Sequence, residues 1–453
     1  MIKVITYGTY DVLHRGHVRL LERAKSLGDY LIVGVTSDDY DRSRGKINNR
    51  NSLFERIAAV KALGIADQIL VEEYDGQKID DIRRLQVDIF TVGSDWKGEF
   101  DYLNEFCKVI YLQRTEGISS TEVRSDSGHL SIGICGYTGF IEKFINETKY
   151  VNGMQVIGIY CKSNSLDLPL KDTRLSSFQD YQSLLANVDA VYVVSEPDRH
   201  YDDVKEALLS GKHVLCESPI ATSKNKCCEL FDLARRNKLI LMDGIKTAYS
   251  TAYERLVLMA KGGKIGDVVS VDAVCTSLWN FNNISEHLRS HNCISYWNSV
   301  CDWAPSALLP IFQIFGVNFK KKVIYSKFYD KSNFDIFTKI DFVFNQGVGS
   351  IKVAKGAKSE GSLVITGTKG YIYVPSPWWK TDYFEIRYED FRDNKRFFYQ
   401  LDGEGIRYEL VAFSKAIESG KNTSYVYESI SEAICLIIQD YNSKTDLIEF
   451  FLV

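Results

Sequence analysis

Long apolar runs are missing from this sequence. No stretch approaches about 18 uninterrupted apolar residues, the length that a helix needs to cross a bilayer. The chain also begins with an apolar segment at residues 2–6 rather than with a charged leader and a hydrophobic core. We therefore expect neither membrane insertion nor a signal peptide, and we expect a cytoplasmic protein.

Paired cysteines are missing as well. The 10 cysteines are scattered; Cys227 and Cys228 are adjacent, but no two cysteines have CxxC spacing. This pattern excludes the disulfide framework of a small secreted protein and argues against a zinc site. We expect reduced thiols, as in a cytosolic protein.

Neither sign of charge is in excess, because 55 Lys and Arg residues face 59 Asp and Glu residues. A near-neutral balance without a basic run lacks the positive surface that a nucleic-acid-binding protein needs. We expect small-molecule substrates and no nucleic-acid partner. At 453 residues the chain is long enough for two or three domains with full cores.

The most informative stretch is the turn that contains His14, Gly16 and His17. It follows the apolar run 2–6, typical of a buried parallel strand, and precedes residues 18–27, whose apolar positions have helical spacing. Such a turn attracts phosphate, because unpaired N–H groups and the helix dipole favour an anion there. Gly16 keeps the backbone bare, and the imidazoles can donate to charge that develops on oxygen. The alternative is that both histidines only cap the turn.

Two signatures at opposite ends of residues 1–126 support a nucleotide site. The first is the HxGH motif at 14–17 and the second is RTEGISST at 114–121, with a GSDW turn at 93–96 between them. With these motifs the segment closely resembles the glycerol-3-phosphate cytidylyltransferase family. The resemblance implies a Rossmann-like parallel-sheet domain that transfers a cytidylyl group from CTP to a polyol phosphate, such as glycerol 3-phosphate, and releases pyrophosphate.

The resemblance also implies roles for single residues. Arg44 or Lys46, and Arg56, would reach the triphosphate, although a cluster of cations in a loop is often only a solvated face. Asp95 would hold the ribose or base, or else cap its turn. The expected catalytic residues are His14, His17, Lys46 and Arg114, the last one neutralising the leaving pyrophosphate. The expected CTP-binding residues are Tyr7, Gly8, Thr9, Tyr10, Asp11, Gly16, Asp38, Arg44, Arg56, Asp95, Trp96, Ile118, Ser119, Ser120 and Thr121.

The implied mechanism is in-line attack by a phosphate oxygen of the acceptor on the α-phosphorus of CTP. Such an enzyme positions and neutralises its substrates, and it needs no nucleophilic side chain. Mg²⁺ on the triphosphate is expected chemically. Asp11 is the candidate metal ligand, although an aspartate at the end of a strand has other uses.

A second strand and glycine turn begin near residue 130. The run 130–136 is apolar, and Gly133, Gly136 and Gly139 form a GxxGxxG turn before a helix. This is the position and composition of a dinucleotide fingerprint, although the spacing departs from GxGxxG. Further strands are expected at 156–160 and 189–195.

From about residue 130 onward the chain resembles the Gfo/Idh/MocA oxidoreductase family, through this turn and the segment 207–221. The resemblance implies a nicotinamide cofactor. Lys162 and Ser163 stand where an acidic residue would bind the ribose of NADH, so NADPH is favoured. The expected cofactor-binding residues are Gly133, Gly136, Tyr137, Thr138, Gly139, Lys162, Ser163, Glu196, Pro197, His200, Glu217 and Pro219.

The second half departs from that family at residues that matter for chemistry. Ser218 replaces the lysine of the family's Glu-Lys-Pro signature, and Ser306 and Leu309 stand where the family has a catalytic His and an Asp. Lys246 or Tyr249, which follow an apolar strand, are candidate catalytic residues for the proton that a carbonyl reduction requires. A lysine at the end of a strand can also be plain surface.

The expected fold class is α/β, in three domains. A nucleotidyltransferase Rossmann-like parallel-sheet domain (1–126) is fused to a Rossmann NAD(P)-binding-like domain (127–249) and to an α+β domain with a large, mostly antiparallel sheet (250–453). Strands of that sheet are expected at 323–328, 336–344, 363–374 and 384–388. Such a sheet often forms a dimer surface, so a homodimer or higher homo-oligomer is expected.

The sequence favours a bifunctional protein of CDP-polyol synthesis for a capsule or teichoic-type polymer. In this interpretation the second half reduces a ketose phosphate to the polyol phosphate that the first half activates. A rival interpretation is that residues 127–453 form a non-catalytic binding or oligomerisation module. A third is an acceptor other than glycerol phosphate, because no residue in the sequence specifies the acceptor.

Overall fold

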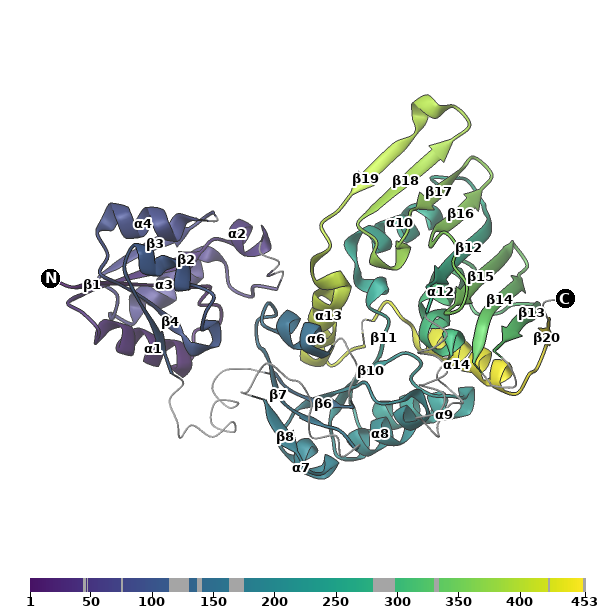
Figure 1. The fold of residues 1–453 in the computed structure, drawn as a ribbon, viewed down its shortest axis with the longest axis horizontal. Helices are drawn as coiled ribbons and strands as arrows, with labels where there is room; N and C mark the ends of the chain where they lie inside the picture. Colours follow the sequence, from purple (N-terminus) through teal and green to yellow (C-terminus); the bar gives the residue numbers. More distant parts are fainter. Residues whose placement is uncertain are drawn as a thin grey trace. The chain divides into compact units, whose positions relative to one another are not determined.

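The computed structural model describes residues 1–43, 46, 48–74, 76–113, 130–136, 141–162, 175–279, 298–329, 334–422 and 424–450. The chain divides into two compact units (Figure 1). Unit 1 comprises Met1–Leu130 with Thr148–Gln155, and unit 2 comprises Ser131–Glu147 with Val156–Val453.

Unit 1 is built on a five-stranded parallel sheet with the order β3-β2-β1-β4-β5. Its strands are β1 (Lys3–Gly8), β2 (Tyr30–Thr36), β3 (Gln68–Glu72), β4 (Ile89–Gly93) and β5 (Lys108–Leu112). Its helices are α1 (Arg15–Lys25), α2 (Asp38–Ser43), α3 (Leu53–Ala62) and α4 (Gln77–Leu85), with 3₁₀ turns η1 (Ser94–Trp96) and η2 (Asp101–Glu105). The parallel strand expected at 2–6 is confirmed as β1, and the helix after it begins at Arg15, earlier than expected.

The side chains of β1 alternate between two cores, as the pleat of a strand requires. Val4 packs with residues of α1 and α3, while Ile5 and Tyr7 pack on the other face with residues of α4. β1 lies between β2 and β4, so β2 and β3 are added on one side of β1 and β4 and β5 on the other. The order of the strands therefore reverses its direction at β1. Ligands of open parallel sheets bind at such a point, beyond the C-terminal ends of the strands.

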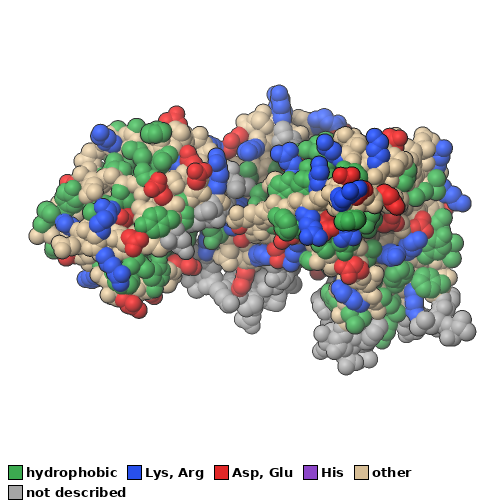
Figure 2. All heavy atoms as spheres, turned by 90° about the horizontal axis from the view of Figure 1, so that it is seen from above, with side chains coloured by type: hydrophobic (Ala, Val, Ile, Leu, Met, Phe, Trp, Pro, Cys, Tyr) green, Lys and Arg blue, Asp and Glu red, His purple; other side chains and the backbone are tan. Residues whose placement is uncertain are grey.

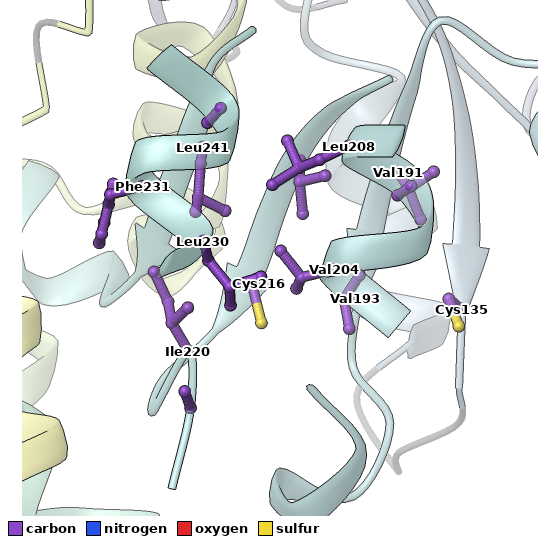
Figure 3. Packing of buried hydrophobic residues seen from close by; sticks show 14 of the residues in the cluster. Cys135, Val191, Val193, Val204, Leu208, Cys216, Ile220, Leu230, Phe231 and Leu241 are labelled. Atoms are coloured by element: carbon purple, nitrogen blue, oxygen red, sulfur yellow. The ribbon is translucent and has the colours of Figure 1, made fainter. Parts of the chain in front are cut away.

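The first part of unit 2 contains a six-stranded sheet with the order β11-β10-β9-β6-β7-β8. Its strands are β6 (Leu130–Cys135), β7 (Met154–Tyr160), β8 (Ser176–Phe178), β9 (Ala190–Val193), β10 (His213–Glu217) and β11 (Leu241–Gly244). Its helices are α6 (Ile141–Thr148), α7 (Tyr181–Ala186), α8 (Pro197–Leu209) and α9 (Lys224–Arg236). Figure 3 shows the core: Val191 and Val193 of β9 face Val204 and Leu208 of α8.

The second part of unit 2 is a nine-stranded sheet with the order β19-β18-β17-β16-β12-β15-β14-β13-β20. Most neighbouring strands are antiparallel, as expected, but β12–β15 and β13–β20 are parallel pairs. The strands are β12 (Val268–Thr276), β13 (Lys321–Phe328), β14 (Asp335–Val343), β15 (Val348–Ala354), β16 (Leu363–Gly367), β17 (Gly370–Val374), β18 (Tyr383–Tyr388), β19 (Lys395–Phe398) and β20 (Leu447–Glu449). The single strand expected at 363–374 is wrong: it is the hairpin β16–β17, which turns at Thr368 and Lys369.

Helices and short turns complete unit 2. The helices are α10 (Thr251–Lys261), α12 (Ser299–Phe315), α13 (Ile406–Ser419) and α14 (Glu428–Asn442), and the 3₁₀ turns are η3 (Lys246–Tyr249), η5 (Trp378–Lys380), η6 (Phe391–Asp393) and η7 (Asp402–Gly405). Helix α12 packs on β12, β14 and β15. No helix in the described ranges combines the length and apolarity that crossing a membrane would take. Lys and Arg side chains are interspersed with Asp and Glu on the face drawn in Figure 2.

Two candidate functional sites

The first candidate site is the turn between β1 and α1, and its backbone is strained. Tyr10 and Val12 have φ angles of 53° and 45°, in the left-handed region that L-residues avoid. The Tyr10 ring lies over Gly8, where an added Cβ would come 3.0 Å from its Cζ. Strain of this kind persists only where surrounding contacts impose it, and it concentrates at functional sites.

His14 and His17 cap helix α1 with their Nδ1 atoms. The Gly16 N–H donates to Nδ1 of His14 at 3.0 Å, and the His14 N–H donates to Nδ1 of His17 at 3.4 Å. The two rings stack with centroids 3.9 Å apart. A ring nitrogen that accepts a hydrogen bond carries no proton, so each neutral ring has its proton on Nε2. The histidines therefore do cap the turn, and this is compatible with the predicted phosphate binding because capping fixes Nε2 as a donor.

Gly16 is required by the position of the His14 ring. A Cβ at residue 16 would lie 2.8 Å from Cε1 and 2.9 Å from Nδ1 of His14. These distances are shorter than carbon contacts allow, so any side chain at residue 16 would displace the imidazole. The glycine thus serves the geometry of the neighbouring histidine as well as the approach of a ligand.

Lys46 reaches the same turn from the loop after β2. Its Nζ donates to Oγ1 of Thr9 at 2.8 Å, and the Thr9 hydroxyl donates to Asp41 at 3.1 Å. A positive charge is thereby held beside the end of β1, where the sequence predicts a cation. Arg44, the other candidate, lies outside the described residues.

The structure corrects the role expected for Arg56. Its side chain is fully buried and donates to the backbone oxygens of Thr9 at 2.7 Å and Thr36 at 2.8 Å. It also forms ion pairs with Asp38 and, at 3.7 Å, with Asp41. Arg56 therefore joins the ends of β1 and β2 from inside and does not extend into the ligand region. The Asp38 carboxylate is engaged by the same guanidinium.

Asp11 also has a positioning role in this structure. Its two carboxylate oxygens accept the N–H groups of Arg50 at 2.8 Å and Asn51 at 2.9 Å, which hold the segment before α3. The part of the chain that the structure describes contains no group of three or more His, Cys, Asp or Glu residues that could hold a metal ion. The described residues do not form a resident Mg²⁺ site, Asp11 as a metal ligand stays a prediction, and Mg²⁺ is expected as part of the nucleotide substrate.

The two tyrosines of the turn do not extend into the ligand region either. The Tyr7 hydroxyl donates to Asp81 of α4 at 2.9 Å, and burial beside that carboxylate raises the pKa of Tyr7. Tyr10 is buried with its ring edge against His17, at 5.6 Å between centroids. The Tyr7 side chain thus binds the far face of the sheet and the Tyr10 side chain supports a histidine, and CTP binding by these two residues stays a prediction.

The remaining residues of the first site are described only in part. Trp96 ends η1 and packs near Phe100, at 6.1 Å between ring centroids. The side chain of Asp95 lies outside the described residues. The same holds for Arg114, Ile118, Ser119, Ser120 and Thr121.

The second candidate site lies at the C-terminal ends of β6, β9, β10 and β11 in unit 2. Gly136 begins the turn after β6 with a φ of 106°, and a Cβ there would lie 2.3 Å from the backbone nitrogen of Ser195. Gly133 is a correction: it lies within β6, where its missing side chain makes room for Leu184. Lys162 is exposed just after β7, as expected. Tyr137, Thr138, Gly139 and Ser163 lie outside the described residues.

His200 is a structural bridge rather than a cofactor ligand, which corrects its predicted role. It is 2% exposed, and its Nδ1 and Nε2 lie 2.8 Å and 2.7 Å from the carbonyl oxygens of Pro219 and Ser195. The ring joins the segments that leave β9 and β10. Glu196 and Pro197 are the N-cap and first residue of α8, where proline is favoured.

Three buried carboxyls lie near this edge, and sequence reasoning missed them as a group. Burial raises the pKa of Glu217 to about 7 and of Asp243 to about 6, and it raises the pKa of Glu409 well above its usual range. The Tyr192 hydroxyl donates to Glu217. Glu217 and Asp243 lie near the C-terminal ends of apolar strands, and this position could have indicated them from the sequence. Glu409 belongs to α13, far along the chain, and had no such indication.

Lys246 and Tyr249 differ in their access to this edge. Lys246 follows β11 with 31% of its side chain exposed, and its charge lowers the pKa values of Glu217 and Glu409 against the effect of burial. Tyr249 is 4% exposed, and its hydroxyl lies 2.6 Å from that of Ser424. The expectation that Tyr249 could donate a proton to a substrate is therefore corrected.

A further ion pair lies one helical turn before Ser306, the position at which the resembled family has a catalytic histidine. Lys355, 1% exposed, pairs with Asp302 of α12, and its ammonium lies 4.6 Å from the centroid of the Trp279 ring. Ser306 follows one turn later on α12. Sequence reasoning missed this lysine, because it lies beyond β15 with no motif around it.

Comparison with known proteins assigns unit 1. A family model described as "Cytidylyltransferase-like" matches residues 5–126. A glycerol-3-phosphate cytidylyltransferase of Bacillus spizizenii is 46% identical over 130 residues, which are 29% of this chain and 100% of that protein. This chain belongs to the cytidylyltransferase-like family. The cytidylyltransferase of Staphylococcus aureus with the same description is 44% identical over 28% of this chain and 95% of its own length.

A different family model matches the beginning of unit 2. A model described as "Oxidoreductase family, NAD-binding Rossmann fold" matches residues 130–245. The solved structure of KijD10 from Actinomadura kijaniata, a 3-ketoreductase in complex with NADP and TDP-benzene, has a TM-score of 0.61. It is 17% identical and covers 71% of this chain and 99% of its own. This likeness shows the fold of unit 2.

Proposed function

We propose that unit 1 transfers a cytidylyl group from CTP to glycerol 3-phosphate or a similar polyol phosphate. The observation that carries the proposal is the histidine pair, in which both Nδ1 atoms are used as caps so that both Nε2 atoms are donors. The relatives named above carry this reaction in their names. The experiment is incubation of the full chain with CTP and a panel of polyol phosphates, with pyrophosphate release and CDP-polyol formation as the readouts.

In this mechanism a phosphate oxygen of the acceptor attacks the α-phosphorus of CTP. A new P–O bond forms, the bond from the α-phosphorus to the bridging oxygen breaks, and pyrophosphate leaves with the electron pair. The N-terminus of α1, the Nε2–H groups of His14 and His17 and the charge of Lys46 stabilise the developing negative charge. Arg56 and Asp11 hold this arrangement from behind. Arg114 and Ser119–Thr121 belong to the proposal through the sequence motif.

We further propose that unit 2 reduces a ketose phosphate to the polyol phosphate that unit 1 uses. A bound nicotinamide would supply the hydride to the carbonyl carbon, and Lys162 with Ser163 would select NADPH over NADH. Lys246, which is accessible and adjacent to Glu217 and Glu409, would give the proton to the carbonyl oxygen. In this proposal the domains are 1–126, 127–249 and 250–453, and the nine-stranded sheet is the dimerisation surface.

A second candidate function for unit 2 is a non-catalytic binding or oligomerisation module. The replacement of the signature lysine by Ser218, a residue with no cationic group, favours it. Titration with NADPH and NADH, followed by NADPH oxidation with dihydroxyacetone phosphate, separates the two. We expect Lys246→Ala to slow oxidation about a hundredfold and Tyr249→Phe to leave it unchanged. Binding without oxidation would support the module.

A further inference from the structure

Three lysines of unit 2 converge on one carboxylate, that of Glu404. Lys143 of α6 lies 2.6 Å from Glu404 Oε1, Lys380 of η5 lies 2.7 Å from the same oxygen, and Lys246 of η3 lies 3.7 Å from Oε2. The lysines come from three elements that are distant in sequence. Between 31% and 38% of each side chain is exposed, so the cluster is open to solvent.

Glu404 reaches this position through an unusual backbone. Gly403, Glu404 and Gly405 have φ angles of 56°, 55° and 93°, three consecutive residues in the left-handed region. The two glycines are needed, because a Cβ at 403 would lie 2.0 Å from Oε2 of Glu147 and one at 405 would lie 2.9 Å from the carbonyl oxygen of Lys246. Glu404 has the same conformation between the two glycines, and its carboxylate contacts the three lysines.

The charges around the cluster leave it positive. Arg407 pairs with Glu147 at 2.9 Å and with Asp402 at 3.8 Å, so these three residues together carry a formal charge of −1. Lys246 also faces the buried Glu217 and Glu409. Lys143 and Lys380 share the Glu404 carboxylate, and the three lysines with Glu404 carry a formal charge of +2, which the Arg407 group reduces to +1. The lysines hold the pKa of Glu404 down to about 2, despite burial.

The cluster also borders the edge where the second candidate site lies. Lys143 is in the first turn of α6, the helix that follows the Gly136 turn, and Lys246 follows β11. A ligand that reacts beside Lys246 would place a group a few ångströms away between Lys143 and Lys380. A phosphate dianion matches such a pair of ammonium groups in charge and in its number of acceptor oxygens.

We propose that Lys143 and Lys380 bind the phosphate group of the substrate of unit 2, and that Glu404 occupies this subsite when no substrate is bound. Lys246, which pairs with Glu404 and interacts electrostatically with the buried Glu217 and Glu409, serves the carbonyl oxygen. The identification of the substrate as a phosphorylated ketose rests on the proposed function of unit 2. The phosphate comes from a phosphomonoester or from the diphosphate of a sugar nucleotide, and the test separates these sources.

The test measures binding to the full chain by calorimetry, with inorganic phosphate, dihydroxyacetone phosphate and TDP-glucose as separate probes. Lys380→Ala should weaken binding of dihydroxyacetone phosphate at least tenfold, and Glu404→Gln should tighten it severalfold because the internal competitor has lost its charge. Lys395→Ala, an exposed lysine on β19, is the matched control and should change nothing. Unit 1 is identical in all variants, so its own phosphate binding cancels.

If the cluster around Glu404 serves only to stabilise the fold, Glu404→Gln should lower the melting temperature and bring no gain in affinity. This result would overturn the proposal. Loss of NADPH affinity in Lys380→Ala with unchanged phosphate binding would also overturn it, because the lysines would then serve the cofactor. Affinity changes confined to TDP-glucose would identify the diphosphate source. If the variants change phosphate binding but the wild type oxidises no NADPH, the subsite is upheld and the reductase is refuted. If the wild type oxidises NADPH and neither Lys380→Ala nor Glu404→Gln alters the rate, only the subsite is refuted.

Discussion

His14 and His17 stack at 3.9 Å between ring centroids, and each ring accepts a backbone N–H of the same turn through Nδ1. One pair of contacts thus completes the first turn of α1 and sets the tautomer of both imidazoles. In the proposed mechanism capping and catalysis use different atoms of each ring, because Nδ1 caps the helix and Nε2 would donate to the phosphates. Substitutions that mimic only one nitrogen can test this division.

His17→Asn should fold normally and lose activity. The Asn amide oxygen lies where Nδ1 lies and can still accept the His14 N–H, but the Nε2–H donor is gone. Removing one donor that stabilises transition-state charge costs about two to three orders of magnitude in rate. Pyrophosphate release and the melting temperature are measured together, with His213→Asn in unit 2 as the control. A rate near that of the wild type would remove His17 from the mechanism.

Gly16→Ala should increase helix propensity and still reduce the rate. Alanine is favoured over glycine inside a helix by about 1 kcal/mol, but the new Cβ would lie 2.8 Å from the His14 ring and displace it. A misplacement of about 1 Å at a reacting group can cost roughly a hundredfold. Steady-state kinetics and thermal unfolding check this pair of expectations. Unchanged kinetics would mean that the His14 ring is not held at the position seen here.

Arg56→Met should unfold unit 1 more easily rather than raise the KM for CTP alone. The substitution removes the guanidinium that pairs with the buried Asp41, and breaking a buried ion pair costs about 3–5 kcal/mol. The free energy of unfolding is measured in urea, with Lys61→Met on the same helix as the exposed control. If stability were unchanged while the KM for CTP rose, Arg56 would be a nucleotide ligand after all.

Glu217 should make the stability of unit 2 depend on pH. Its pKa is about 7 in the folded protein against an ordinary value of 4.5, so the folded state binds the proton more tightly. This contribution is complete below pH 4.5 and is lost as the pH rises through about 7. Glu217→Gln cannot titrate, so the variant should gain stability relative to the wild type between pH 5 and pH 8. A difference that is the same at both values would contradict the assigned environment.

The sequence was sufficient to predict the elements that hold the first site, because strand, turn and helix are adjacent in the chain. The HxGH turn, its capping contacts and the Lys46 loop are local features of this kind. Arg56 was misjudged because the carbonyls that it binds, on Thr9 and Thr36, become its neighbours only when β1 and β2 pair. Nothing in the residues around Arg56 signals that burial.

The second unit shows the same limit over longer distances. Strands β6, β9 and β10 were predictable from apolar runs. The cluster around Glu404 was not predictable, because no sequence pattern relates residues 143, 246, 380 and 404. The hairpin β16–β17 was missed although glycines at 367 and 370 flank its turn. The parallel pair β12–β15 was not predictable, because strand order depends on long-range packing.

The central claim is that one chain makes the polyol phosphate and activates it, and a coupled assay tests it directly. The full chain is incubated with dihydroxyacetone phosphate, NADPH and CTP, and CDP-glycerol is measured by mass spectrometry. We expect CDP-glycerol only when all three are present, with one NADPH oxidised for each molecule formed, and its loss in both His17→Asn and Lys246→Ala. If added glycerol 3-phosphate gives CDP-glycerol while dihydroxyacetone phosphate and other ketose phosphates give none, unit 2 is not the reductase that supplies unit 1.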